Sequence, residues 1–111
     1  MMGMALATSD VPIVKATTGI ILMSTKAAKS PQPGPCIRCS RCVDQCPMGL
    51  MPNDLVRFVE RGREADALAY GIRDCIECGV CAYVCPAKID HVRWMRQGKN
   101  AVPGPGSAPR D

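Results

Sequence analysis

The stretch CIRCSRCVDQCP, residues 36–47, is the most informative part of this chain, because it places four cysteines within twelve residues and ends on a proline. The same pattern returns as CIECGVCAYVCP at residues 75–86. Cys36 and Cys75 lie 39 positions apart, and the other three cysteines, the proline and one isoleucine keep that offset. Two copies of C-x₂-C-x₂-C-x₃-C-P in one short chain are a specific signal for iron–sulfur clusters.

The spacing of the cysteines predicts which of them share a cluster. Three cysteines at two-residue gaps can wrap three corners of one cubane, and the backbone then turns away, so the fourth cysteine ligates the other cluster. We therefore expect two [4Fe–4S] clusters with crossed ligation and no catalytic residues. The predicted ligands are Cys36, Cys39, Cys42 and Cys85 for cluster 1, and Cys75, Cys78, Cys81 and Cys46 for cluster 2.

The residues around the cysteines fit this interpretation. Pro47 and Pro86 fix the backbone after the fourth cysteine of each motif. Ser40 and Gly79 are small, which lets backbone N–H groups approach sulfur. Apolar neighbours are expected to screen the clusters from water, namely Ile37, Ile76, Val43, Val80 and Val84. Burial and N–H···S hydrogen bonds both influence a cluster's potential.

Zinc and disulfides are the alternative uses of clustered cysteine. Zinc sites favour pairs of C-x₂-C separated by a loop, and they need no third cysteine at the same short gap. Disulfides form in exported proteins. The N-terminal MMGMALATSD lacks the basic start of a signal peptide, and Asp10 and Pro12 interrupt any apolar run. We therefore expect reduced cysteines that bind metal in a cytosolic setting.

Composition and charge agree with a small metal-binding domain. Only 4% of the 111 residues are aromatic, so the core should be thin and metal should help to hold it together. The formal charge of +4 counts thiols as neutral. Each cluster with its four thiolates adds roughly −2, which brings the loaded chain to about zero. The longest apolar stretch, residues 19–23, is too short for a transmembrane segment.

The chain is expected to have four parts. Residues 1–29 include the Val-, Ile- and Thr-rich run VPIVKATTGIILMS, and we read them as the tail end of a preceding β-containing domain. Residues 30–35, SPQPGP, form a linker. Residues 36–98 form the ferredoxin-type domain with two clusters. Residues 99–111 are rich in Pro and Gly and are predicted to be disordered.

Helices are expected after each motif. Residues 54–61 should form a helix with Asn53 as N-cap and Gly62 as its end, and residues 63–70 a second helix closed by Gly71.

A third helix should follow the second motif, capped by Asp90 and ended by Gly98. His91 at its start is expected to be exposed or capping. These inserts predict a mostly α fold, an α-helical ferredoxin-like domain, with the compact α+β bacterial ferredoxin as the alternative.

Two quoted stretches carry a resemblance to a known family. GPCIRCSRCVDQCPMGLMP, residues 34–52, and DCIECGVCAYVCPAKI, residues 74–89, resemble the C-terminal ferredoxin domain of RnfC, and so does the preceding segment MMG…TTGIILM. RnfC is one of the subunits of the Rnf ion-translocating electron-transport complex. The resemblance covers roughly residues 1–97, and the family's eight cluster ligands fall on the eight cysteines without gaps.

The resemblance implies a function and a location. RnfC is a peripheral subunit on the cytoplasmic side of the bacterial inner membrane, and its upstream part carries FMN and an NADH site. Electrons pass between NAD(H) and ferredoxin, coupled to Na⁺ or H⁺ transport. The implied partners are the other subunits of the complex, with ferredoxin as a further candidate. This chain has no Gly-rich flavin or nucleotide loop, so it is expected to transfer electrons without oxidising NADH on its own.

The expected function is therefore a one-electron relay through two [4Fe–4S] clusters. The alternative is a structural iron–sulfur module of a nucleic-acid- or partner-binding protein, because four cations gather near the last helix: Lys88, Arg93, Arg96 and Lys99. Charges of both signs alternate over residues 54–70, which indicates a solvated face, so nucleic-acid binding is not expected.

Charge also differs between the two motifs. Arg38 and Arg41 lie in the first motif where Glu77 and Val80 lie in the second. Positive charge favours the reduced state of a cluster, so the sequence predicts a higher potential for cluster 1.

Overall fold

The computed structural model describes residues 5–102, and the chain divides between Gln32 and Pro33 into two units. In the N-terminal unit the short helix α1, Thr25–Ala28, begins where the Ser24 side chain accepts a hydrogen bond from the Ala27 N–H. The run 11–24 is exposed and, within the described residues, contains no strand. The predicted β-segment is therefore not observed, because an extended run without a paired neighbour gains no ladder hydrogen bonds.

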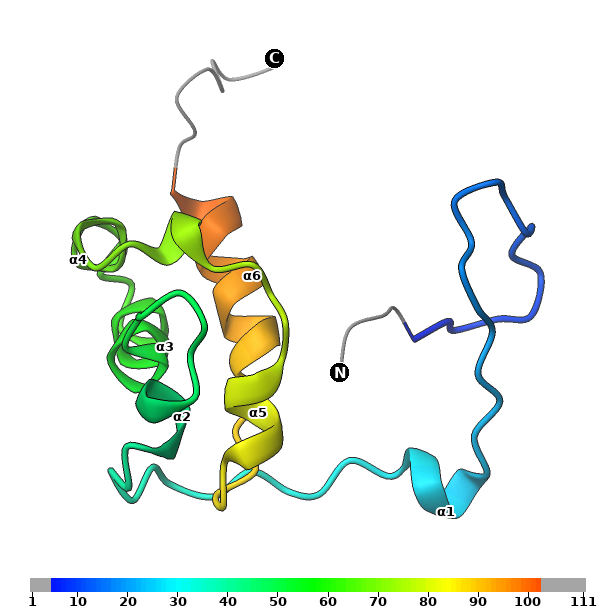
Figure 1. The fold of residues 1–111 in the computed structure, drawn as a ribbon, viewed down its shortest axis with the longest axis horizontal. Coiled ribbons are helices and arrows are strands. Elements are labelled where there is room, and N and C mark those ends of the chain that lie inside the picture. Colours follow the sequence, from blue (N-terminus) through cyan, green and yellow to red (C-terminus); the bar gives the residue numbers. More distant parts are fainter. Residues whose placement is uncertain (1–4, 103–111) are drawn as a thin grey trace. The chain divides into compact units, whose positions relative to one another are not determined.

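The C-terminal unit is built of helices and loops (Figure 1). Its elements are α2 Arg41–Asp44, α3 Pro52–Glu60, α4 Glu64–Ala69, the 3₁₀ helix η1 Ile72–Asp74, α5 Val80–Val84 and α6 His91–Ala101. Residues 5–102 contain no strand, so the mostly α prediction is confirmed over the α+β alternative. In that same range, no helix has both the length and the apolar character that crossing a bilayer requires.

The sequence repeat is also a structural repeat. Helices α2 and α5 begin 39 residues apart, and so do α3 and α6. Six left-handed backbone positions form pairs with the same offset: Arg38 and Glu77, Ser40 and Gly79, Gly49 and Lys88. A positive φ at these positions curls each cysteine loop tightly before its helix begins. The two halves therefore share one local fold, far beyond the cysteines themselves.

Helix α3 begins earlier than its capping signal suggests. Pro52 is its first residue and Met51 its N-cap, so the prediction of Asn53 as N-cap is wrong. Proline favours the first helical position, because its fixed φ suits the helix and its missing N–H has no partner there in any case. Gly62, with φ 65°, follows the end of α3, and Gly71, with φ 78°, follows α4 as predicted.

Helix α6 starts as predicted but ends later. The Asp90 side chain accepts a hydrogen bond from the Arg93 N–H at 3.2 Å, which caps the helix. Gly98 does not end it, and α6 continues to Ala101. The predicted start of the disordered tail at residue 99 is therefore wrong, since 99–101 are helical and Val102 is buried. The rest of that tail, residues 103–111, lies outside the described residues.

The reason for Gly98 is close packing. A Cβ at this position would lie 2.5 Å from Cγ2 of Val59 and closer still to Cδ1 of Ile72. Helix α6 thus packs closely against α3 and η1, as Figure 1 shows for α3 and α6. The core cluster at this contact consists of Leu55, Val56, Val59, Ala67, Ile72, Met95 and Val102.

Replacing Gly98 with Ala should destabilise the domain. Overpacking costs about 1–3 kcal/mol, and the better helix propensity of alanine returns at most about 1 kcal/mol. We expect a net loss near 1–2 kcal/mol, seen as a fall in the midpoint of thermal or urea unfolding of the cluster-loaded chain. Asn100→Ala, at an exposed position of the same helix, is the control. An unchanged or higher midpoint for Gly98→Ala would contradict the packing argument.

Candidate metal centre

The eight cysteines line two cavities, four to each. The first cavity is lined by Cys36, Cys39, Cys42 and Cys85. The second cavity is lined by Cys46, Cys75, Cys78 and Cys81. Each cavity thus takes three cysteines from one motif and the last cysteine of the other, which is the grouping that the spacing predicted for the ligands. Within residues 5–102, no three potential ligands converge closely enough to hold a single metal ion.

The linings of the two cavities are related by the 39-residue repeat. Pro52 lies in the second cavity and His91, at the equivalent position, in the first. Asn53 lies in the first and its equivalent, Val92, in the second. The N-terminal turns of α3 and α6 therefore reach both cavities. The crossed pattern extends from the cysteines to the helices that support them.

Backbone N–H groups point at cysteine sulfur. The Leu50 N–H donates to Sγ of Cys46, and the Glu77 N–H donates to Sγ of Cys75, each at 3.4 Å. Such bonds favour the thiolate form, which is the form that binds iron.

Burial acts in the opposite direction on the innermost thiols. It raises the pKa of the Cys81 thiol to about 11, and neighbouring thiolates add to that rise. Burial also raises the pKa of Cys42, opposed in part by backbone N–H groups of Asn53 and Val43. These thiols stay protonated at neutral pH unless a cation compensates for the lost solvation, and metal binding displaces their protons. The donor set, four soft sulfur atoms around each cavity, fits an iron–sulfur cluster.

The two cavities differ in their exposure. Cys36 and Cys39 of the first cavity are exposed, whereas all four cysteines of the second are partly buried. Ile37 and Ile76 lie at the cavity edges but are 66% and 54% exposed. The prediction that these two isoleucines shield the site thus holds only in part, because their side chains lie on the outer side of each loop.

Two residues of the first cavity were not expected there. His91 is only 2% exposed, so its predicted exposed or capping role is wrong. Its Nδ1 lies 3.0 Å from the carbonyl oxygen of Ile89, and burial lowers the pKa of the imidazole. The Oδ1 of Asn53 is buried without a hydrogen-bond partner. The sequence repeat could have indicated that His91 is buried, because His91 is equivalent to Pro52, which is buried at the start of α3.

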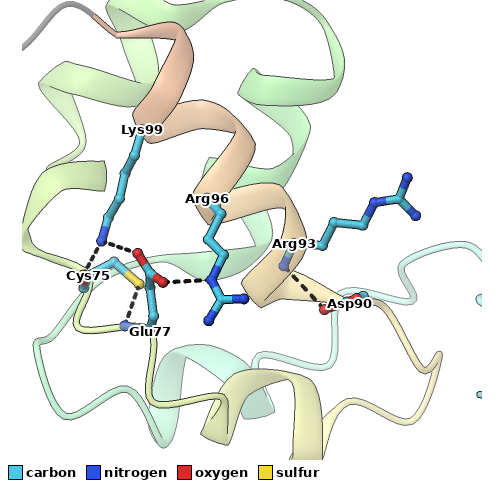
Figure 2. Close-up of polar contacts among 6 residues, drawn as sticks. All are labelled: Cys75, Glu77, Asp90, Arg93, Arg96 and Lys99. Atoms are coloured by element: carbon cyan, nitrogen blue, oxygen red, sulfur yellow. Dashed lines mark hydrogen bonds and ion pairs between the residues drawn. The ribbon is translucent and has the colours of Figure 1, made fainter. Parts of the chain in front are cut away.

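A cluster of charges fixes the second cysteine loop (Figure 2). The Glu77 carboxylate pairs with Nε of Arg96 and Nζ of Lys99, both at 2.8 Å. Hydrogen bonds from Lys99 and Arg96 lower the pKa of Glu77. Two of the four cations that suggested a nucleic-acid surface are therefore engaged within the domain.

Comparisons with known proteins agree with this site. The family described as a 4Fe-4S dicluster domain matches residues 35–89. Among similar proteins, the C subunit of the ion-translocating oxidoreductase complex of Citrobacter koseri is 44% identical over 103 residues, 92% of this chain and 15% of that protein. Its namesake from Rhodobacter capsulatus is 41% identical over 72 residues, 65% of this chain and 14% of that protein.

A third relative has a more specific name. The C subunit of the Na⁺-translocating ferredoxin:NAD⁺ oxidoreductase complex of Acetobacterium woodii is 36% identical over 61 residues, 55% of this chain and 14% of that protein. The chain thus spans between 14% and 15% of the length of these three relatives.

The buried imidazole predicts a pH dependence of stability. Because its folded-state pKa is lowered, the unfolded chain binds more protons at His91, and stability falls as the pH drops below the unfolded value of about 6.5. Between pH 7.5 and 5.5 we expect the thermal midpoint of the loaded wild type to fall more than that of His91→Gln. Glu77, with its lowered pKa, titrates below this window. Parallel slopes for the two proteins would contradict the assignment.

Proposed function

Because this chain belongs to the RnfC family of ion-translocating oxidoreductase complexes, we propose that it is the electron-transfer module of such a complex, passing single electrons through two [4Fe–4S] clusters. The observation that carries the proposal is the pair of cavities, each lined by four cysteines drawn from both motifs. The match of residues 35–89 to a 4Fe-4S dicluster domain supports the same cofactor.

The proposed ligands follow the two linings. Cluster 1 is held by Cys36, Cys39, Cys42 and Cys85, and cluster 2 by Cys75, Cys78, Cys81 and Cys46. When bound, such clusters supply one-electron oxidation and reduction with no bond made or broken in a substrate. The chain's own contribution is to hold the thiolates, to donate N–H groups to sulfur and to limit access of water.

Partners are proposed from the family. The name of the Acetobacterium woodii relative includes ferredoxin and NAD⁺, and we propose that the other subunits of such a complex, with ferredoxin as a candidate, exchange electrons with this module. We further propose that the NADH reaction of such a complex takes place outside the residues of this chain, because the chain resembles the C-terminal ferredoxin domain of RnfC. We also propose that the module works at the cytoplasmic side of the membrane.

The structural iron–sulfur module remains the alternative. Its basic surface is weakened by the pairing of Arg96 and Lys99 with Glu77. Reduction of the loaded chain by dithionite, with an EPR signal from two interacting clusters, is expected for the relay. Clusters that stay silent to reduction, together with salt-dependent binding to DNA, would favour the alternative.

Paired cysteine variants test the crossed ligation. Cys46→Ala with Cys78→Ala removes two ligands of the same proposed cluster, so about four iron atoms per chain should remain. Cys46→Ala with Cys39→Ala removes one ligand from each cluster, so iron should fall far below four. Iron content and EPR of anaerobically purified protein provide the measurement.

Ligation confined within each motif gives the reverse order. Cys46→Ala with Cys39→Ala would then keep one cluster, and Cys46→Ala with Cys78→Ala would lose both. The equivalent variants at Cys85 serve as matched controls for crossed ligation. Cys85→Ala with Cys39→Ala removes two ligands of cluster 1, so cluster 2 should remain. Cys85→Ala with Cys78→Ala removes one ligand from each cluster, so neither should remain. Wild-type protein holding far fewer than about eight iron atoms would reject the proposed function itself.

A further inference from the structure

Glu77 occupies an unusual place in the second cysteine loop. It lies between Cys75 and Cys78, with a left-handed backbone, and its own N–H donates to Sγ of Cys75. Its carboxylate leaves the loop and meets Arg96 and Lys99 of α6, each at 2.8 Å. Figure 2 shows the two cations approaching the same carboxylate from successive turns of the helix.

Lys99 connects the helix to the loop a second time. Its Nζ lies 2.5 Å from the carbonyl oxygen of Cys75 and 2.8 Å from Oε1 of Glu77. Arg96 and Lys99 are three residues apart and so lie on the same face of α6. The last turns of α6 therefore contact both the main chain of Cys75, a proposed ligand, and the side chain of Glu77 in the same loop.

The side chains of this contact are less exposed than those of an ordinary surface ion pair, so their interaction should be stronger. The side chains of Glu77 and Lys99 are 26% and 24% exposed, and only Arg96, at 47%, is close to half exposed. A network of partly buried charges is screened less than isolated surface pairs are.

Equivalent positions in the two halves of the repeat carry charges of opposite sign at two of three places. Arg38 occupies the position equivalent to Glu77, and Arg57 and Glu60 occupy those equivalent to Arg96 and Lys99. Arg38, Arg57 and Glu60 line one groove beside Cys36. Each half thus carries two cations and one carboxylate at these three positions, a net of one positive charge. The cysteine motifs alone suggest more positive charge near cluster 1 than near cluster 2. The two cations of α6, Arg96 and Lys99, supply positive charge near cluster 2 and remove this difference.

We propose that Glu77, Arg96 and Lys99, the charge triad, form a positioning element that holds the second cysteine loop on α6 and keeps a net positive charge beside cluster 2, raising its potential. This inference rests on the proposed function, because it requires a cluster in the second cavity. Positive charge near a cluster favours its reduced form, and net charge is among the factors that set the potential.

Charge-neutral variants of the triad should move one potential in opposite directions. Arg96→Gln and Lys99→Gln each remove a positive charge, so the potential of cluster 2 should fall. Glu77→Gln removes the negative charge, so it should rise. We expect the ratio of reduced to oxidised cluster at a fixed potential to change about tenfold, or about 59 mV for one electron. An EPR-monitored redox titration of the full chain measures both clusters.

Two further variants separate charge from structure. Arg93→Gln removes the same charge from the same helix, but the Arg93 side chain points away from Glu77 (Figure 2), so the potential of cluster 2 should stay at its wild-type value. Arg96→Lys keeps the charge and should keep the potential near that of the wild type. These measurements are made only on variants that hold the same iron content as the wild type.

The outcomes are distinct. The triad is supported if Arg96→Gln and Glu77→Gln shift the midpoint of one cluster in opposite directions and Arg93→Gln leaves that midpoint unchanged. Shifts of the same sign in Glu77→Gln and Arg96→Gln, or no shift in either, overturn it while leaving the proposed function intact. Loss of iron in all three triad variants, with Arg96→Lys also depleted, would also overturn the potential-setting role and leave only structural support. Wild-type protein without about eight iron atoms rejects the proposed function first.

Discussion

The gathering of four cysteines around each cavity, with thiols such as Cys42 and Cys81 withdrawn from water, governs how the domain is built. A buried thiol resists ionisation, as the raised pKa of Cys81 indicates, and a cation must compensate before it can become a thiolate. The chain places four thiols around each cavity and turns backbone N–H groups toward sulfur. Because each cavity uses cysteines of both motifs, neither half of the repeat can complete a cavity by itself.

The core and the cavities share the same elements. Leu55 of α3 and Met95 of α6 belong to the buried core and also line the second cavity. The two helices approach closely at Gly98, and their N-terminal turns both line the cavities. Changes in the packing of α3 and α6 should therefore alter the shape of the metal centre. Metal binding should in turn contribute to the stability of a core this small.

Electrostatics provides a second level of organisation. The two loops have opposite charges at equivalent positions, Arg38 and Glu77, and this difference alone would make the sites unequal. The contact of Glu77 with Arg96 and Lys99 changes that balance, because it brings two cations to one carboxylate. In a domain that is proposed to carry electrons between two similar clusters, such a balance bears directly on which of them is reduced first.

Features that depend on local spacing could be predicted before the fold was known. The 39-residue repeat, the grouping of cysteines now seen around two cavities, the cap at Asp90 and the turn at Gly71 all follow from patterns a few residues long. Helix boundaries were predicted less accurately, because α3 begins at Pro52 and not after an N-cap at Asn53.

The role of Gly98 and the pairing of Glu77 could be known only from the folded chain. The partners of Glu77 lie 19 and 22 residues away in the chain. Gly98 owes its identity to side chains of other elements. Contacts of this kind depend on how α6 packs across the domain, and no local pattern of residue types encodes that packing.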